Sequence, residues 1–195
     1  MSGSYSPVKR IMLGCTLGIE NAYMVGHDWA AMMMHKFVRK YRNRVIRAIT
    51  FDPMTPDFGP FYLGFPHMAE SWYSQFQQLD MAVELVTSSW EACAIYFRHF
   101  FDHSAHAPPL LSPEEENIYV DNFMKERNVL GGFNWYRANL SVTSDPFTQL
   151  DKTISDVPIT FLHGMGDPVV PSTVSVDVPK YYYNYTMEYL PDCGH

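Results

Sequence analysis

One short stretch, Val25-Gly26-His27-Asp28-Trp29-Ala30, decides the fold of this chain. The apolar residues before it predict a short buried strand over 21–25, and the apolar periodicity after it predicts an amphipathic helix over 29–41. Between them, the pattern small–His–Asp–Trp–small has the form of a nucleophile elbow, the sharp strand-to-helix turn that holds a reactive side chain above a sheet. We therefore predict that Asp28 is a carboxylate nucleophile, stabilised by the N-terminus of the following helix.

Small residues on both sides of Asp28 favour such a turn. Gly26 and Ala30 each lie two positions away, where a large side chain would clash in so tight a bend. The alternative interpretation is an ordinary strand–turn–helix in which Asp28 only caps the helix.

The same residues carry a family resemblance. Gly26–Ala30, followed by Phe37–Tyr41 and Arg44-Val45, is similar to the α/β-hydrolases with an aspartate nucleophile, which are the epoxide hydrolases and the haloalkane dehalogenases. The resemblance implies an α/β fold: the C-terminal half of an α/β-hydrolase core, with a mostly parallel sheet of about four strands and a helical lid insertion. It also implies that the chain is N-terminally truncated, because relatives carry further strands and a His-Gly-x-Pro loop before this point.

The resemblance divides the chain into three parts. Residues 1–53 form the elbow part of the hydrolase core, 54–150 form the lid, and 151–195 form the part of the core with the acid and histidine loops. Other predicted elements are strands and helices, in chain order: strand Val45–Phe51, helices Ala69–Ser88, Glu91–Phe101 and Pro113–Asn128, strand Val157–Leu162, a short helix Val174–Tyr182, and strand Thr186–Leu190. Ser112, Pro113 and Glu115 have the spacing of a capping box.

Composition excludes several classes of function. With 195 residues, 47% hydrophobic and 18% charged, the chain can bury a sizeable core and is not disordered. A net charge of -7 argues against a nucleic-acid partner. There is no apolar run long enough to span a membrane. The three cysteines lack paired or metal-ligand spacing, so we expect a reducing, cytoplasmic location. The resemblance implies that the chain uses neither a metal nor an organic cofactor. The oligomeric state stays open.

The resemblance supplies a catalytic triad in the order nucleophile, acid, histidine. Asp28 matches the nucleophile, Asp167 lies in a Gly-x-x-Asp loop after a predicted strand, and His195 follows Gly194 after the last predicted strand. Asp52 follows the second strand, where some relatives place the acid, but a turn residue is the simpler interpretation.

Two tyrosines in the lid distinguish the subfamilies. Segment 71–79, SWYSQFQQL, and segment 131–137, GGFNWYR, resemble the epoxide hydrolase segments that carry the two lid tyrosines, here Tyr73 and Tyr136. The alternative is that both rings only pack in an aromatic lid core and take no part in the chemistry. Two phenols aimed at one oxygen can hydrogen-bond and protonate the leaving alkoxide of an epoxide.

The predicted reaction opens a small apolar epoxide with water to give a vicinal diol through an ester on Asp28. Oxyanion or substrate contacts are expected from residues beside the nucleophile and the tyrosines: Trp29, His27, Trp72 and Trp135. Two alternatives stay open. In a haloalkane dehalogenase, Trp29 would hold the departing halide. In an inactive truncated fragment, the missing strands would leave an exposed sheet edge.

Overall fold

The computed structural model describes residues 16–52, 55, 67, 69–140 and 152–195. The predicted part boundaries at 53/54 and 150/151 fall outside these residues. The described elements belong to two compact units. A sheet unit contains all four described strands, and a helical unit contains the helices between Trp72 and Asn139 together with Gly166–Val169 and Gly194-His195.

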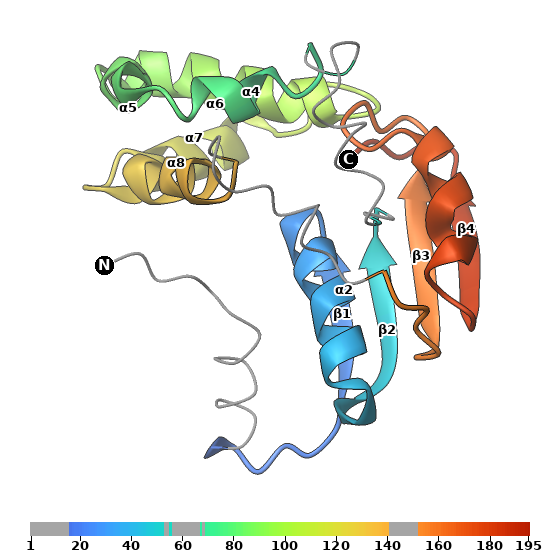
Figure 1. Cartoon of the computed structure of the whole chain (residues 1–195). Coiled ribbons are helices and arrows are strands. Elements are labelled where there is room, and N and C mark those ends of the chain that lie inside the picture. Colours follow the sequence, from blue (N-terminus) through green and yellow to red (C-terminus); the bar gives the residue numbers. More distant parts are fainter. Residues whose placement is uncertain (1–15, 53–54, 56–66, 68, 141–151) are drawn as a thin grey trace. The chain divides into compact units, whose positions relative to one another are not determined.

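The sheet unit is built on four parallel strands. They are β1 (Ala22–His27), β2 (Val45–Phe51), β3 (Ile159–Gly164) and β4 (Tyr185–Leu190), hydrogen-bonded in that order (Figure 1). Parallel neighbours need crossover connections, which here run through a helix, through the helical unit and through a 3-10 helix. This topology confirms the predicted α/β fold with a parallel sheet.

One face of this sheet carries the core of the unit. Helix α2 (Trp29–Lys40) matches the predicted helix to within one residue and buries Met34, Phe37 and Val38. These side chains pack with Ala48 of β2, Phe161 of β3 and their apolar neighbours. The apolar stripe of α2 is therefore what fixes the helix on the sheet.

A polar cluster of Tyr182, His35 and Arg39 borders this core. The hydroxyl of Tyr182 lies 2.7 Å from Nδ1 of His35 and accepts a hydrogen bond from Nη1 of Arg39 at 3.1 Å. Arg39 also donates to the Tyr181 carbonyl at 2.8 Å. Burial raises the pKa of the Tyr182 phenol, which therefore stays protonated at neutral pH. His35 is thus a buried residue that packs and hydrogen-bonds within this cluster.

The second face of β1 is open. Tyr23 is 73% exposed and Val25 is 68% exposed, so the strand predicted as buried over 21–25 is covered on one face only. Alternation explains this: Met24 and Gly26 point toward the core, and the residues between them point away. Among the described residues, β1 pairs with β2 alone.

Between β3 and β4, where a short helix over 174–182 was expected, the chain forms the 3-10 helix η3 (Ser172–Lys180). Pro179 lies inside it and has no N–H, so an α-helix over these residues would lack the hydrogen bond from residue 179 to residue 175. Another short 3-10 turn, η1 (Arg42–Arg44), links α2 to β2.

The helical unit contains five helices in its described residues: α4 (Trp72–Phe76), α5 (Asp80–Val86), α6 (Trp90–Ser104), α7 (Pro113–Phe123) and α8 (Asn128–Asn139). Its core is apolar and aromatic, with Cys93, Tyr96, Phe97, Val120 and Phe133 among the buried side chains. No helix in the described part of the chain has the length and apolar character that crossing a membrane requires.

The helices of this unit differ from the predictions in three main places. Helix α7 ends at Phe123, five residues before the expected end at Asn128. The helix expected over 69–88 is interrupted between α4 and α5, where Leu79 is extended and Gln77 is buried, donating to the Tyr96 hydroxyl at 2.8 Å. Helix α8 was not expected, because Gly131-Gly132 disfavours a helix; burial of Val129 and Phe133 outweighs that propensity. The capping box at Ser112 is confirmed.

Candidate active site

The elbow at the end of β1 is a strained turn. Asp28 has φ 52° and ψ −124°, a combination that L-residues avoid. Its carbonyl accepts the first hydrogen bonds of α2, from the backbone N–H groups of Ala31 at 2.9 Å and Met32 at 3.3 Å. Its carboxylate makes no capping hydrogen bond to the helix. The turn therefore has the predicted form, and the capping interpretation is wrong.

Gly26 lets this turn form. A Cβ atom on Gly26 would lie 3.0 Å from the carbonyl carbon and oxygen of Ala30 and 3.1 Å from the backbone nitrogen of Ala31. Backbone atoms at such distances cannot move aside independently of the helix. The small residue two positions before Asp28 is thus required by close approach of the strand to the first turn of α2.

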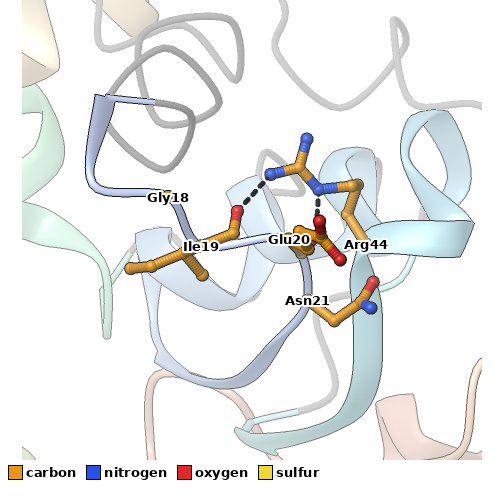
Figure 2. Close-up of a pocket in the computed structure, with 5 residues that line it drawn as sticks. All are labelled: Gly18, Ile19, Glu20, Asn21 and Arg44. Carbon is orange, nitrogen blue, oxygen red and sulfur yellow. Dashed lines mark hydrogen bonds between the residues drawn. The ribbon is translucent and has the colours of Figure 1, made fainter.

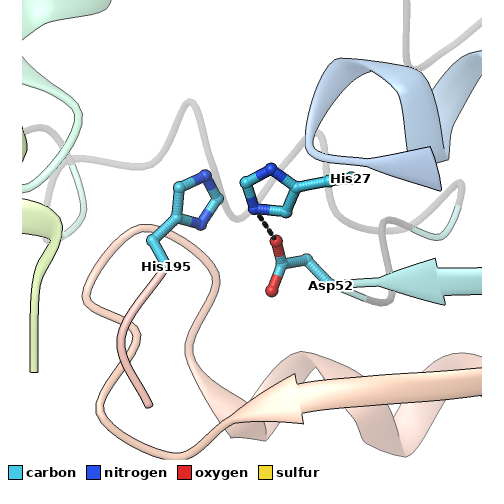
Figure 3. A group of neighbouring side chains, drawn as sticks. All are labelled: His27, Asp52 and His195. Carbon is cyan, nitrogen blue, oxygen red and sulfur yellow. Dashed lines mark ion pairs between the residues drawn. The ribbon is translucent and has the colours of Figure 1, made fainter.

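His27, beside Asp28, points to the end of the neighbouring strand. Its Nε2 atom lies 3.0 Å from Oδ2 of Asp52, which follows β2 and is buried (Figure 3). Asp52 has a left-handed φ of 66°, and its backbone N–H donates to the Leu162 carbonyl at 3.1 Å. Asp52 is thus a turn residue, as expected, but it also holds His27, which a linear sequence does not reveal.

The helical unit contains the acid and the histidine as a pair. Nδ1 of His195 lies 2.8 Å from Oδ2 of Asp167, and the Asp167 side chain is fully buried. The second oxygen, Oδ1, accepts the backbone N–H of Val169 at 2.7 Å. Because an ionised carboxylate only accepts hydrogen bonds, Nδ1 is the donor, and Nε2 of His195 keeps the lone pair that a general base needs.

The C-terminal end of α6 fixes the backbone of His195. The His195 N–H donates to the Ser104 carbonyl at 2.8 Å. A Cβ atom on Gly194 would collide with that same carbonyl oxygen and lie 2.6 Å from the backbone nitrogen of His106. Glycine before the histidine is therefore a requirement of this contact, because any larger residue would push His195 away from α6.

Tyr73 on α4 and Tyr136 on α8 lie side by side. Their rings meet edge to face with centroids 5.8 Å apart, and Tyr73 also packs against Phe100 at 4.8 Å. Trp72 packs into the helical core, with rings 5.8 Å from Tyr96 and 5.1 Å from His99. The structure thus places the two predicted tyrosines in contact, and Trp72 is a packing residue of the helical core.

Trp135 is half-buried on α8, next to Tyr136, and Trp29 is half-buried at the start of α2. The predicted site residues are therefore divided by unit. His27, Asp28 and Trp29 belong to the sheet unit, and the tyrosines, their tryptophan neighbours, Asp167 and His195 belong to the helical unit.

A separate pocket of about 470 Å³ lies at the opposite end of β1 and contains none of the predicted site residues. Its lining includes Gly18, Asn21 and Arg44, and Arg44 donates from Nη2 to the Ile19 carbonyl at 2.6 Å (Figure 2). In open α/β sheets, ligands bind beyond the carboxyl ends of the strands. This pocket is at the amino end and is not the candidate active site.

Comparison with known families matches residues 8–195 to the model described as "alpha/beta hydrolase fold". The chain belongs to the α/β-hydrolase fold family.

Solved structures agree with this assignment at the level of the fold. The epoxide hydrolase CorEH, solved without ligand, superposes with a TM-score of 0.76 and 18% identity, covering 97% of this α/β-hydrolase and 66% of CorEH. An epoxide hydrolase from metagenomes of hot environments gives 0.75 and 22%, with 98% and 68% covered. A Salmonella enterica protein provisionally named an acyltransferase gives 0.80 and 19%, with 99% and 65% covered. The chain spans about two thirds of the length of these structures.

Two contacts of this α/β-hydrolase site were missed at the sequence level. The pairing of His27 with Asp52 joins the ends of two strands, and the packing of Gly194 on Ser104 joins the end of the chain to a helix. The only sequence signals were an aspartate directly after a strand and a glycine directly before the histidine. Both are common in loops, so neither identified its partner.

Proposed function

We propose that this protein hydrolyses an epoxide to a vicinal diol through an ester intermediate on Asp28. The strained elbow supports this role, since a residue held at φ 52° without capping its helix is positioned at a cost to stability. The carboxylate of Asp28 would attack an epoxide carbon and break the carbon–oxygen bond of the ring.

The observation that carries the choice of an epoxide is the contact between the rings of Tyr73 and Tyr136. An epoxide oxygen leaves as an alkoxide, which is a poor leaving group unless hydrogen bonds or a proton stabilise it. Two phenols from separate helices would bind that oxygen, and one would transfer its proton to it. A halide needs no such proton, so this tyrosine pair favours the epoxide over a haloalkane.

The ester would then be hydrolysed with help from His195. Its Nε2 atom would take a proton from water while the water oxygen attacks the ester carbonyl, and Asp167 would stabilise the imidazolium that forms. The backbone N–H of Trp29 would donate to the resulting oxyanion. Collapse of this intermediate expels the second diol oxygen, which takes the proton back from the His195 imidazolium. Asp28 is released as its carboxylic acid, and the proton that it then loses restores the tyrosine phenol, so the enzyme returns to its starting state with the diol free. The cycle requires water but neither a metal nor an organic cofactor.

We assign the helical unit the role of a lid over the substrate. Its aromatic core joins α4 to α8, with the rings of Phe76 and Phe133 in contact, and so supports the two tyrosines that these helices carry. His27 and Trp135 would bind parts of the substrate remote from the reacting oxygen.

A single-turnover experiment with styrene oxide tests the proposal. The unmodified chain and a His195→Gln variant are each mixed, in excess, with the substrate, and both protein mass and diol are followed. We expect diol from the unmodified chain. The variant should accumulate an adduct of one substrate molecule, which peptide mapping locates on Asp28. A further Asp28→Asn substitution should abolish the adduct.

The other outcomes separate the alternatives. An adduct formed from a chloroalkane, with none from the epoxide, would identify a haloalkane dehalogenase. A folded protein that forms neither an adduct nor diol would be the inactive fragment. Circular dichroism on the same samples establishes whether the protein is folded.

A further inference from the structure

The helical unit has a pocket of its own, lined by residues of α6, of α7 and of the loop that joins these two helices. Its volume is about 440 Å³, within the range of about 300–1,000 Å³ that small-molecule sites have. Trp90, Phe101 and Leu111 give it an apolar wall, and none of the predicted site residues lines it. The pocket is therefore distinct from the candidate active site.

Helix α7 holds the aromatic wall of this pocket in place. Nε1 of Trp90 donates to Oδ1 of Asp121 on α7 at 2.8 Å, so the indole has a fixed orientation. The ring of Phe101 contacts that of Tyr119, also on α7, with centroids 5.3 Å apart. Because a preformed wall does not have to be ordered when a ligand arrives, its aromatic faces can bind at little entropic cost.

The loop between the two helices closes another side. The backbone N–H of Leu110 donates to Oδ1 of Asp102 at 2.9 Å. Asp102 lies in the last turn of α6, so this bond ties the loop to the helix, and Pro109 and Leu111 of the loop line the pocket. The carboxylate of Asp102 is half-buried and belongs to the same lining.

The lining of the pocket carries a net charge of −1, from one arginine and two carboxylates: Arg98, Asp102 and Glu116. Arg98 donates from Nε and Nη2 to the two carboxylate oxygens of Glu116, at 2.8 and 2.5 Å, so these two charges offset each other. In the described part of the chain Asp102 belongs to no ion pair, and the partner of its Oδ1 atom is the neutral Leu110 N–H. The pocket thus presents one carboxylate beside aromatic faces.

We propose that this pocket binds an organic ammonium ion with an aromatic body. The face of an indole or phenyl ring attracts a cation, and it also packs against another ring. The Asp102 carboxylate would accept a charge-assisted hydrogen bond from the ammonium group. An anionic ligand would be repelled by the same carboxylate. This site is additional to the proposed hydrolysis of epoxides and does not depend on it.

Three probes that share a phenyl ring and a similar length, but differ in charge, test the proposal: 2-phenylethylammonium, 2-phenylethanol and 3-phenylpropanoate. Isothermal titration calorimetry on the unmodified chain measures each affinity. We expect a Kd of about 1 mM or tighter for the ammonium ion, the size usual for so small a ligand. The alcohol should bind about fivefold more weakly or worse, and the carboxylate more weakly still. In ¹H–¹⁵N NMR spectra, the ammonium ion should shift the Trp90 indole N–H and the Leu111 amide.

Substitutions locate the charge and the aromatic face. Asp102→Asn keeps an oxygen for the Leu110 N–H and removes the negative charge, so it should weaken binding of the ammonium ion about fivefold and leave the alcohol unchanged. Glu84→Gln, on the exposed surface of α5, removes the same charge outside the pocket and should match the unmodified chain. Trp90→Leu should weaken binding of the ammonium ion about tenfold.

Three results would each overturn this proposal. Equal affinities for the ammonium ion and the alcohol would show that charge plays no part. Equal losses in Asp102→Asn and Glu84→Gln would show that the ammonium ion responds only to the negative charge of the whole chain. Shifts confined to other helices, such as the one that carries Tyr73, would place the ligand elsewhere. The comparison of probes uses the unmodified chain, so it decides even if a variant fails to fold, and a failure of epoxide turnover leaves it unaffected.

Discussion

The aromatic rings of Tyr73 and Tyr136 meet edge to face at 5.8 Å, although the two residues belong to different helices, α4 and α8. Neighbouring phenols can share one acceptor, so each can compensate in part for loss of the other.

The two tyrosines should therefore act together in opening the epoxide. We expect Tyr136→Phe to slow ester formation about tenfold and the double variant, with Tyr73→Phe, to slow it about 100-fold or more. Stopped-flow single turnovers, read by quenching and mass analysis, measure this step directly. Tyr119→Phe on α7, a half-exposed tyrosine, is the control and should have no effect. Normal ester formation in the double variant would exclude the two-phenol mechanism.

Gly26 should be needed for stability as well as for the elbow. A methyl group there meets backbone atoms of Ala30 at 3.0 Å, so we expect Gly26→Ala to lower the free energy of unfolding by about 1–3 kcal/mol. Gly131→Ala is the matched control: its methyl group meets no atom within 4 Å, and it lies inside α8. That change should stabilise the protein by about 0.5–1 kcal/mol. Urea denaturation compares the two, and a tolerated alanine at position 26 would contradict the close approach.

The Tyr182 hydroxyl should contribute to the stability of the sheet unit. Tyr182→Phe removes the hydrogen bonds to His35 and Arg39 without changing the ring, and we expect a loss of about 1–3 kcal/mol. Tyr183→Phe changes the next residue, which is 82% exposed, and should change stability by less than about 0.5 kcal/mol. Equal losses of stability in thermal or urea unfolding would show that the hydrogen bonds of the Tyr182 hydroxyl do not stabilise the protein.

The capping box of α7 should make part of the stability depend on pH. Hydrogen bonds from the backbone and the hydroxyl of Ser112 lower the pKa of Glu115. A carboxyl whose pKa is lowered by folding stabilises the protein above its unfolded pKa, and this contribution is lost as pH falls through the folded pKa. We expect Ser112→Ala to lower the melting temperature by about 3 °C at pH 7 and by less at pH 3. A difference that is independent of pH would show that the carboxylate of Glu115 takes no part.

Much of the fold follows from local patterns in the chain. The strand before Asp28, the helix after it and the capping box at Ser112 are specified by residues close in sequence, and each forms where it was predicted, although β1 is covered on one face only. The predictions failed where packing outweighed propensity. Helix α8 forms in spite of Gly131-Gly132 because Val129 and Phe133 are buried.

The candidate site was less predictable than the fold. Chain order and family resemblance indicated Asp167 and His195, and the structure brings this pair to 2.8 Å. The contacts that hold the pair could not be predicted, since Ser104 and Val169 are brought to it only by tertiary structure.

The backbone angles of Asp28 have an evolutionary consequence. Glycine adopts positive φ without the steric penalty that an aspartate incurs, so Asp28→Gly should raise thermal stability and remove the nucleophile together. A library screened only for resistance to heat should therefore enrich glycine at position 28, and one screened for turnover should exclude it. Retention of aspartate at this strained position would then itself be a sign of selection for chemistry.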